Sequence, residues 1–121
     1  MNTALIVEDS LTEAEIISSC LRAGGISVLL AKSGEEALET LGSSSPDIII
    51  LDIVLPGCSG FELCRTIKAE SKTSTIPVVM CSTKGSDMDK FWGMKQGADA
   101  YLSKPVDQDQ LIQTVRELIS R

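Results

Sequence analysis

The stretch Pro46-Asp-Ile-Ile-Ile-Leu-Asp52 runs four consecutive large apolar residues directly into an aspartate. A strand that is apolar at every position is typical of a parallel sheet that is covered on both faces. A turn signal, Pro56-Gly57, follows a few residues later. The stretch therefore predicts a buried central strand over residues 47–53, with Asp52 near its carboxyl end.

Outward from this strand, apolar runs and helical periodicity alternate along the chain. The expected strands cover residues 2–7, 26–31, 47–53, 76–82 and 100–103. Each is followed by an expected helix, over residues 10–23, 33–42, 59–70, 86–96 and 107–121. Serine or aspartate N-cap signals, such as the capping box Ser10-Leu-Thr-Glu13, begin several of them. Because right-handed crossovers place helices on both faces of a parallel sheet, we predict an α/β fold in one domain, residues 1–121.

Four of the five expected strands end in residues that suit phosphoryl chemistry. These residues are Glu8 and Asp9 after the first strand, Asp52 after the third, Ser82 after the fourth and Lys104 after the fifth. Ligands of open α/β sheets bind at the carboxyl edge, where these side chains would meet. Only the second strand lacks such a residue, which favours an edge position for it. We therefore predict a flavodoxin-like, doubly wound, five-stranded parallel sheet in the order 2-1-3-4-5, with five helices.

Three of these residues are carboxylates that we expect within a few ångströms of one another. Glu8, Asp9 and Asp52 would repel each other, and the pKa of at least one should rise. A Mg²⁺ ion would relieve the repulsion, because it prefers hard oxygen ligands. Either acid of the Glu8-Asp9 pair alone would be read as a polar strand end, so the three together predict the metal site.

Asp52, Lys104 and Ser82 would complete a site for a phosphoryl group. A carboxylate can act as a nucleophile and form an aspartyl-phosphate, while an ammonium and a hydroxyl bind phosphoryl oxygens. A cis peptide bond between Lys104 and Pro105 would fix the direction of the ammonium. Each residue alone has an ordinary alternative: an Asx turn before Pro56, a solvated lysine, and a serine that forms a turn.

Composition counts against several other functions. The net charge of −6 argues against nucleic-acid binding, and the absence of histidine excludes a His-based triad, a His-ligated zinc site and a phosphohistidine in the chain. No stretch approaches the roughly 20 apolar residues that span a bilayer, and no secretory signal is present. We therefore expect no membrane insertion and a cytoplasmic protein. No GxGxxG or GK[ST] loop follows a strand, which counts against a nucleotide-binding module.

Several apolar side chains are expected in the core. Cys20 and Cys81 fall in a helical and a strand pattern and are read as reduced core residues. Met88, Phe91 and Trp92 share one side of a helix at helical spacing, which favours core packing with Trp92 at the margin. The alternative is an aromatic anchor for a partner, since tryptophan is enriched at binding hot spots.

Together, these motifs resemble those of response-regulator receiver domains, the phosphoacceptor half of two-component signalling. The resemblance covers essentially the whole chain. It rests on Leu5-Ile-Val-Glu-Asp-Ser10, on Pro46-Asp-Ile-Ile-Ile-Leu-Asp52 with Pro56-Gly57 and Gly60, on Ser82-Thr83, and on Gly97-Ala-Asp-Ala-Tyr-Leu-Ser-Lys-Pro105. Each motif is modest alone, but their order and spacing are highly specific.

The resemblance implies a role for each site residue. Asp52 would accept a phosphoryl group from a histidine kinase or a small phosphodonor in a Mg²⁺-dependent reaction. Asp9 and Asp52 would bind Mg²⁺ directly, together with the backbone carbonyl of Val54, and Glu8 would complete the acidic pair. Lys104 would pair with the phosphoryl group. The protein would be a signalling protein rather than an enzyme, limited to self-catalysed phosphotransfer and slow autodephosphorylation.

The resemblance also implies a switch. Ser82 would be the switch hydroxyl, and Tyr101 the aromatic residue that follows it. The signalling surface for a downstream protein would comprise Lys84 to Lys95, Tyr101, and Val106 to Thr114. The chain would act as a stand-alone, chemotaxis-type receiver, and the stretch 92–98 resembles regulators of pilus-based motility.

The chain departs from the family pattern at three places. It has Glu8-Asp9 where Asp-Asp is common, an apolar Val54 two residues after Asp52, and Cys58-Ser59 where many relatives have Met-Asp. We expect these changes to tune the phosphoryl lifetime without abolishing phosphorylation. The alternatives are a Mg²⁺-dependent phosphohydrolase, which usually has a second acid where Val54 stands, and a pseudo-receiver scaffold that is never phosphorylated.

Overall fold

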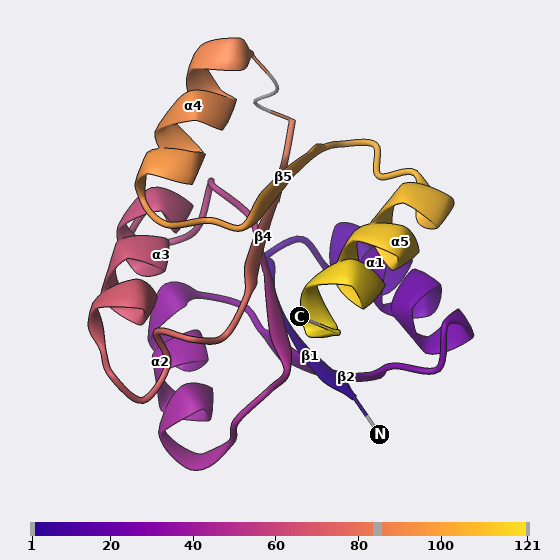
Figure 1. The fold of residues 1–121 in the computed structure, drawn as a ribbon, viewed down its shortest axis with the longest axis horizontal. Coiled ribbons are helices and arrows are strands. Elements are labelled where there is room, and N and C mark those ends of the chain that lie inside the picture. The colour runs from indigo at the N-terminus through magenta and orange to yellow at the C-terminus, as the bar shows by residue number, and fades with distance from the viewer. Residues whose placement is uncertain (1, 84–85, 121) are drawn as a thin grey trace.

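The computed structural model describes residues 2–83 and 86–120, in which strands and helices alternate as predicted (Figure 1). The elements are β1 (Thr3–Val7), α1 (Leu11–Ala23), β2 (Ser27–Ala31), α2 (Gly34–Ser43), β3 (Ile48–Leu51), α3 (Gly60–Ala69), β4 (Val78–Ser82), α4 (Asp87–Lys95), β5 (Ala100–Ser103) and α5 (Gln108–Ile119). Residues 84 and 85 of the predicted signalling surface, beginning with Lys84, and Arg121 at the end of the last predicted helix lie outside the described residues. None of the helices in the described part of the chain has the length and apolar character that crossing a bilayer requires.

The strands form one parallel sheet in the order β2-β1-β3-β4-β5, which confirms the predicted topology. The apolar strand β3 lies in the middle. β2, which is followed by no residue suited to phosphoryl chemistry, lies at one edge, as predicted. The register pairs Val7 with Leu51, Leu51 with Met80, and Ser82 with Ser103. The residues that follow β1, β3 and β5 are therefore carried to the same edge of the sheet.

The sheet is buried on both faces, with α2, α3 and α4 on one side and α1 and α5 on the other (Figure 1). Side chains alternate between the two cores, as the period of two in a strand requires. The α2–α4 side includes Leu5, Val7, Ile49, Leu51, Val78 and Met80. The α1–α5 side includes Ala4, Ile6, Ile48, Ile50, Val79 and Cys81, with Cys20 only partly buried at its margin. The strands are therefore apolar at successive positions because helices cover both faces of the sheet, as predicted.

Each of the five helices in the described residues begins with a side-chain cap, of the kind that the sequence indicated for several of them. The N-cap oxygen accepts a hydrogen bond from the backbone N–H three residues later, which satisfies a donor that the helix leaves unpaired. The N-cap residues are Ser10, Ser33, Ser59, Ser86 and Asp107.

One prediction about the core is wrong. Met88, Phe91 and Trp92 on α4 are 73%, 56% and 52% exposed, so they do not pack in the core. In the part of α4 that the structure describes, the buried residue is Gly93, which faces the sheet. Gly93 lies on roughly the opposite side of the helix from these three residues, so the apolar spacing identified a shared side but not which side is buried.

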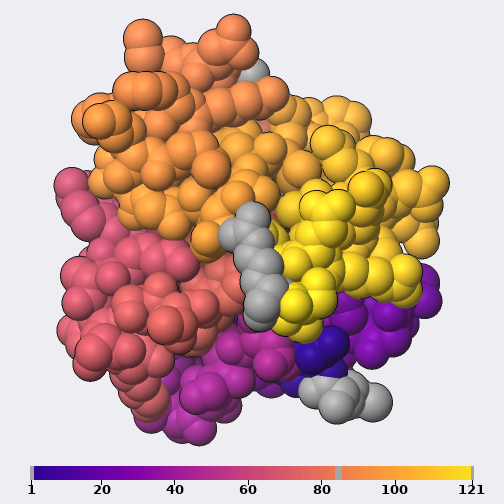
Figure 2. Space-filling model, viewed as in Figure 1, coloured from indigo at the N-terminus to yellow at the C-terminus, as the bar shows by residue number. Residues whose placement is uncertain are grey.

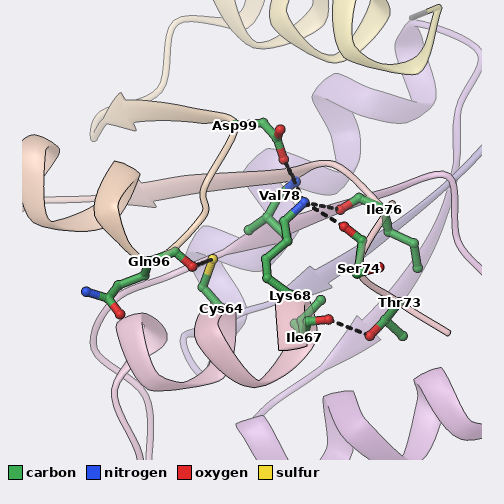
Figure 3. Close-up of polar contacts among 9 residues, drawn as sticks. All are labelled: Cys64, Ile67, Lys68, Thr73, Ser74, Ile76, Val78, Gln96 and Asp99. Carbon is green, nitrogen blue, oxygen red and sulfur yellow. Dashed lines mark hydrogen bonds and ion pairs between the residues drawn. The ribbon is translucent and has the colours of Figure 1, made fainter. Parts of the chain in front are cut away.

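At the amino edge of the sheet, the ammonium of Lys68 joins two loops (Figure 3). Its Nζ donates hydrogen bonds to the carbonyl oxygen of Ile76 at 2.8 Å and to Oδ2 of Asp99 at 3.0 Å. The same Asp99 oxygen accepts a hydrogen bond from the backbone N–H of Val78 at 2.9 Å. The loop that leads into β4 and the loop that leads into β5 are therefore fixed together.

Candidate functional site

At the carboxyl edge, the ammonium of Lys104 lies among three carboxylates. Its Nζ donates hydrogen bonds to Oε1 of Glu8 at 2.5 Å and to Oε2 of Glu13 at 2.8 Å. It also lies 3.5 Å from Oδ2 of Asp52. The side chains of Lys104, Glu8 and Asp52 are 7%, 2% and 10% exposed, whereas that of Glu13 is 38% exposed. The cluster is therefore open to water mainly at Glu13.

Backbone hydrogen bonds at the strand ends hold these residues in place. The N–H of Glu8 donates to the carbonyl oxygen of Ala31 at 2.9 Å, and that of Asp52 to Val7 at 3.1 Å. The N–H of Lys104 donates to the carbonyl oxygen of Ser82 at 2.9 Å, and the Lys104–Pro105 peptide bond is cis. Glu8, Asp52 and Lys104 are thus each positioned by the strand beside their own.

The loop after Asp52 closes tightly over it. The N–H of Gly60 donates to the carbonyl oxygen of Ile53 at 2.6 Å, and Val54 forms an isolated antiparallel bridge with Ser59. A Cβ atom on Gly60 would overlap the carbonyl oxygen of Asp52, so only glycine permits this approach. The side chain of Val54 is 55% exposed and apolar, so only its backbone can serve as a ligand.

The charges of the cluster shift the pKa values of its members. Burial raises the pKa of Glu8, and the nearby charge of Asp52 adds to the rise, although hydrogen bonds from Lys104 and Ser10 oppose it. This is the rise expected for one acid of the site. Burial alone would lower the pKa of Lys104, but its hydrogen bonds to Glu13 and Glu8 raise it well above the ordinary value. The ammonium is therefore firmly protonated at neutral pH.

The structure brings together some of the predicted site residues and leaves one apart. Glu8, Asp52 and Lys104 meet as described. Asp9 is exposed. Among the described residues, three carboxylates have oxygens within 4.8 Å of one another, and Asp9 is not one of them. Glu13, from the first turn of α1, takes that place. β1 ends at Val7, and beyond it Glu8 is 4% exposed whereas Asp9 lies at a bend and is exposed.

Ser82 and Tyr101 lie beside this cluster. Ser82, at the end of β4, is 1% exposed. Its side chain forms a hydrogen bond with Tyr101, whose pKa is raised, first by burial and then by the charge of Asp89. The two predicted switch residues are therefore in direct contact.

The donor set suits a hard divalent cation. The carboxylate oxygens of Glu8, Glu13 and Asp52 that could bind an ion all lie within 4.8 Å of one another. Mg²⁺ prefers oxygen ligands of this kind and is bound through a small number of carboxylates. The carboxylates at this edge therefore fit a Mg²⁺ site that would share them with the Lys104 ammonium.

Glu13 was missed as a site residue. The sequence explained it as the fourth residue of the capping box, and its backbone N–H does donate to Oγ of Ser10 at 3.3 Å. Its side chain, however, is not needed to cap the N–H of Ser10, which donates to Oε2 of Glu8 at 3.2 Å. The carboxylate of Glu13 is thus left for Lys104.

Comparisons with curated proteins find relatives over the whole chain. The chain is 38% identical to Protein PilH of Pseudomonas aeruginosa over 99% of both chains. It is 36% identical to Sensory transduction protein RegX3 of Mycolicibacterium smegmatis, and there it spans only 52% of the relative's length.

Solved structures agree with the fold. A response regulator from Chloroflexus aurantiacus matches with a TM-score of 0.96 and 38% identity, over 99% of this chain and 98% of that one. The receiver domain of sensor histidine kinase PA1611 from Pseudomonas aeruginosa, which has a magnesium ion coordinated in its active site cleft, matches with a TM-score of 0.91 and 25% identity, over 99% and 98%.

The family model described as "Response regulator receiver domain" matches residues 4–116. That range includes every residue of the cluster around Lys104. The fold, the strand order and the full-length relatives agree with this match. The chain belongs to the response regulator receiver domain family.

Proposed function

We propose that this chain accepts a phosphoryl group on Asp52 and passes the signal to a protein partner through the surface formed by α4, β5 and α5. The observation that carries the proposal is the contact of the Lys104 ammonium with Glu8 and Asp52 at the carboxyl edge of the sheet. A histidine kinase, or a small phosphodonor, would supply the phosphoryl group. The protein would act as a signalling protein and not as an enzyme with a separate substrate.

The chemistry assigned to Asp52 is nucleophilic. A carboxylate oxygen of Asp52 attacks the phosphorus atom, a P–O bond forms, and the bond from phosphorus to the donor's leaving group breaks. With acetyl phosphate as the donor, the leaving group is acetate. Lys104 is close enough to pair with a phosphoryl oxygen, because its ammonium is 3.5 Å from the Asp52 carboxylate.

Asp9 and Asp52, with the backbone carbonyl of Val54, are the proposed Mg²⁺ ligands, and Glu8 completes the acidic pair. Glu13 adds a carboxylate to the same edge. A bound Mg²⁺ ion would neutralise charge that develops on the transferring phosphoryl oxygens. The magnesium ion described for the receiver domain of PA1611 supports this assignment.

The switch would use the contact between Ser82 and Tyr101. A phosphoryl group on Asp52 offers acceptor oxygens to the Ser82 hydroxyl, which competes with its hydrogen bond to Tyr101. Such competition biases an equilibrium between two positions of the ring. Tyr101 lies in β5, and the segments of α4, β5 and α5 form a continuous part of the surface (Figure 2). A partner on this surface would therefore sense the ring.

The relatives support a proposal about the role and the location of the protein in the cell. The full-length similarity to PilH agrees with the predicted membership of the pilus-motility group. We propose a cytoplasmic location, since the phosphodonor of a receiver is a kinase or a small cytoplasmic metabolite. The exposed Phe91 and Trp92 on α4 favour the aromatic-anchor alternative for the partner surface.

The test is intact-mass measurement after incubation with acetyl phosphate, with and without Mg²⁺, on the natural chain and on Asp52→Asn. We expect one phosphoryl adduct that requires both Mg²⁺ and Asp52. Absence of the adduct from folded, Mg²⁺-supplied protein, repeated with purified histidine kinases as donors, would contradict the proposal. That result would favour a scaffold that binds partners without being phosphorylated.

A further inference from the structure

We infer that Glu13 is a positioning residue that competes with the phosphoryl group for Lys104 and so holds the protein in its unphosphorylated state. The inference rests on the proposed function of Asp52. It assigns to a residue of α1 a role that neither its helix-capping position nor the acidic pair Glu8-Asp9 accounts for.

Distances within the cluster show which partner the ammonium prefers. Nζ of Lys104 lies 2.8 Å from Oε2 of Glu13 but 3.5 Å from Oδ2 of Asp52. The first is a charge-assisted hydrogen bond, while the second is an ion pair beyond ordinary hydrogen-bond distance. To bind a phosphoryl group on Asp52, the ammonium must give up part of its present contacts.

Exposure indicates which contact is released. The side chain of Glu8 is 2% exposed, so loss of the ammonium would leave a buried carboxylate without a cation, at a high cost in free energy. The side chain of Glu13 is 38% exposed, so water can replace the ammonium there at a lower cost. Glu13 is therefore the partner that Lys104 can leave when a phosphoryl group arrives.

The electrostatic effect of Glu13 acts in the same direction. Its carboxylate places a further negative charge next to the position that an anionic phosphoryl group must occupy. Removing that charge would release the Lys104 ammonium from Glu13 and would also lower the repulsion of the phosphoryl group. The same removal would weaken the attraction of the acidic cluster for Mg²⁺, because one of the three clustered carboxylates is lost. Tighter binding of the phosphoryl group together with weaker binding of Mg²⁺ distinguishes this role from a general disruption of the site, which would weaken both.

The substitution Glu13→Gln isolates the charge. Glutamine keeps the size of the side chain, and the cap of α1 uses only the backbone N–H of residue 13. Glu15→Gln is the matched control, because Glu15 lies on the same helix with a side chain 67% exposed and forms a weak ion pair with Arg22, at 4.0 Å. Both variants lose one negative charge from α1.

The experiment measures binding of beryllofluoride, an analogue of the phosphoryl group, by ¹⁹F NMR at saturating Mg²⁺. We expect Glu13→Gln to bind it about threefold to tenfold more tightly than the natural chain, and Glu15→Gln to match the natural chain. A parallel calorimetric titration should show weaker Mg²⁺ binding by Glu13→Gln in the absence of the analogue. In ¹⁵N NMR of the resting protein, the Lys104 ammonium protons should exchange faster in Glu13→Gln.

The outcomes separate this inference from the proposed function. Suppose that the natural chain binds beryllofluoride but Glu13→Gln binds it no more tightly, or that Glu13→Gln and Glu15→Gln change the affinity by the same amount. The role of Glu13 is then refuted, and the function of Asp52 stands. If the natural chain binds none, and Asp52 takes no phosphoryl group, both are overturned. Unchanged exchange of the Lys104 ammonium in Glu13→Gln would also refute the role, whether or not the site is phosphorylated.

Discussion

Gly93 of α4 lies so close to Tyr101 of β5 that a Cβ atom on Gly93 would come within 3.1 Å of Cδ2 of the tyrosine ring. The same Cβ atom would lie 2.9 Å from Sδ of Met80, which is fully buried. The absence of a side chain at this position therefore lets α4 rest directly on the sheet. Since the ring of Tyr101 is our proposed switch, Gly93 couples the position of α4 to that ring.

This contact predicts the effect of Gly93→Ala. Alanine stabilises an exposed helix position by about 1 kcal/mol relative to glycine. Here we expect the opposite sign, a loss of about 1 kcal/mol in the free energy of unfolding, because Met80 and Tyr101 must move to admit the methyl group. Urea unfolding followed by circular dichroism measures the change.

Gly42→Ala is the control for that experiment. Gly42 lies in α2, and a Cβ atom there would meet nothing within 4 Å. We expect it to gain about 0.5 to 1 kcal/mol, as helix propensity predicts. A similar gain in both variants would show that the space beside Gly93 is larger than the structure indicates.

The hydrogen bonds of Lys68 predict a second effect on stability. Lys68→Met keeps the length of the side chain but leaves the Asp99 carboxylate, 25% exposed, without its cation. We expect a loss of about 2 kcal/mol in the free energy of unfolding, because a largely buried charge loses its partner. Arg22→Gln, in an exposed pair with Glu15, should change stability by less than about 0.5 kcal/mol. Equal effects of the two substitutions would contradict the assignment of Lys68 as a buried link between loops.

The sheet and part of the site could be predicted because several local signals agree. The apolar run Ile48–Leu51 identified a strand buried on both faces, and the parallel arrangement placed the strand ends at one edge. That arrangement carries Glu8, Asp52 and Lys104 to the same edge, and the long side chain of Lys104 reaches from the end of β5 to Glu8. Backbone topology, which the pattern of the sequence encodes, was sufficient to place these three residues at one edge.

The contribution of Glu13 could not be predicted from that pattern. Its proximity to Lys104 depends on the rotation of α1 about its own axis, which packing against the sheet determines. The exposed side of α4 has a similar explanation. Met88, Phe91 and Trp92 share one side of that helix, but the close approach of Gly93 to Met80 buries the other side.

The buried hydroxyl of Ser18 is a position at which a substitution should stabilise the fold. Its Oγ atom is buried and has no hydrogen-bond partner among the residues that the structure describes. Ser18→Ala removes this unsatisfied group and improves helix propensity, so we expect a gain of about 1 kcal/mol and a Tm higher by about 3 to 5 °C. Ser19→Ala, at an exposed position of the same helix, should gain only the smaller propensity contribution. If calorimetry gives equal shifts for both, the Ser18 hydroxyl has a partner in solution.

The buried thiols of Cys64 and Cys81 predict a fall in stability at alkaline pH. Burial raises the pKa of Cys64 to about 11 and that of Cys81 to about 12. In the unfolded chain both thiols ionise near their ordinary value, so above that pH the folded state binds more protons. The free energy of unfolding must then decrease as pH rises. Between pH 8 and pH 10 we expect a loss of about 2 to 3 kcal/mol from the two thiols together.

The hydrogen bond of Cys64 supports this direction. Its Sγ lies 3.6 Å from the carbonyl oxygen of Gln96, a contact in which the thiol is the donor and which the thiolate could not make (Figure 3). Lys104 also loses stabilising charge at high pH, but only above its ordinary pKa, so the window from pH 8 to pH 10 reports mainly the thiols. The double variant Cys64→Ala/Cys81→Ala should be less stable at pH 8 but should lose most of the further decrease by pH 10. An unchanged pH dependence in that variant would place the titrating groups elsewhere in the protein.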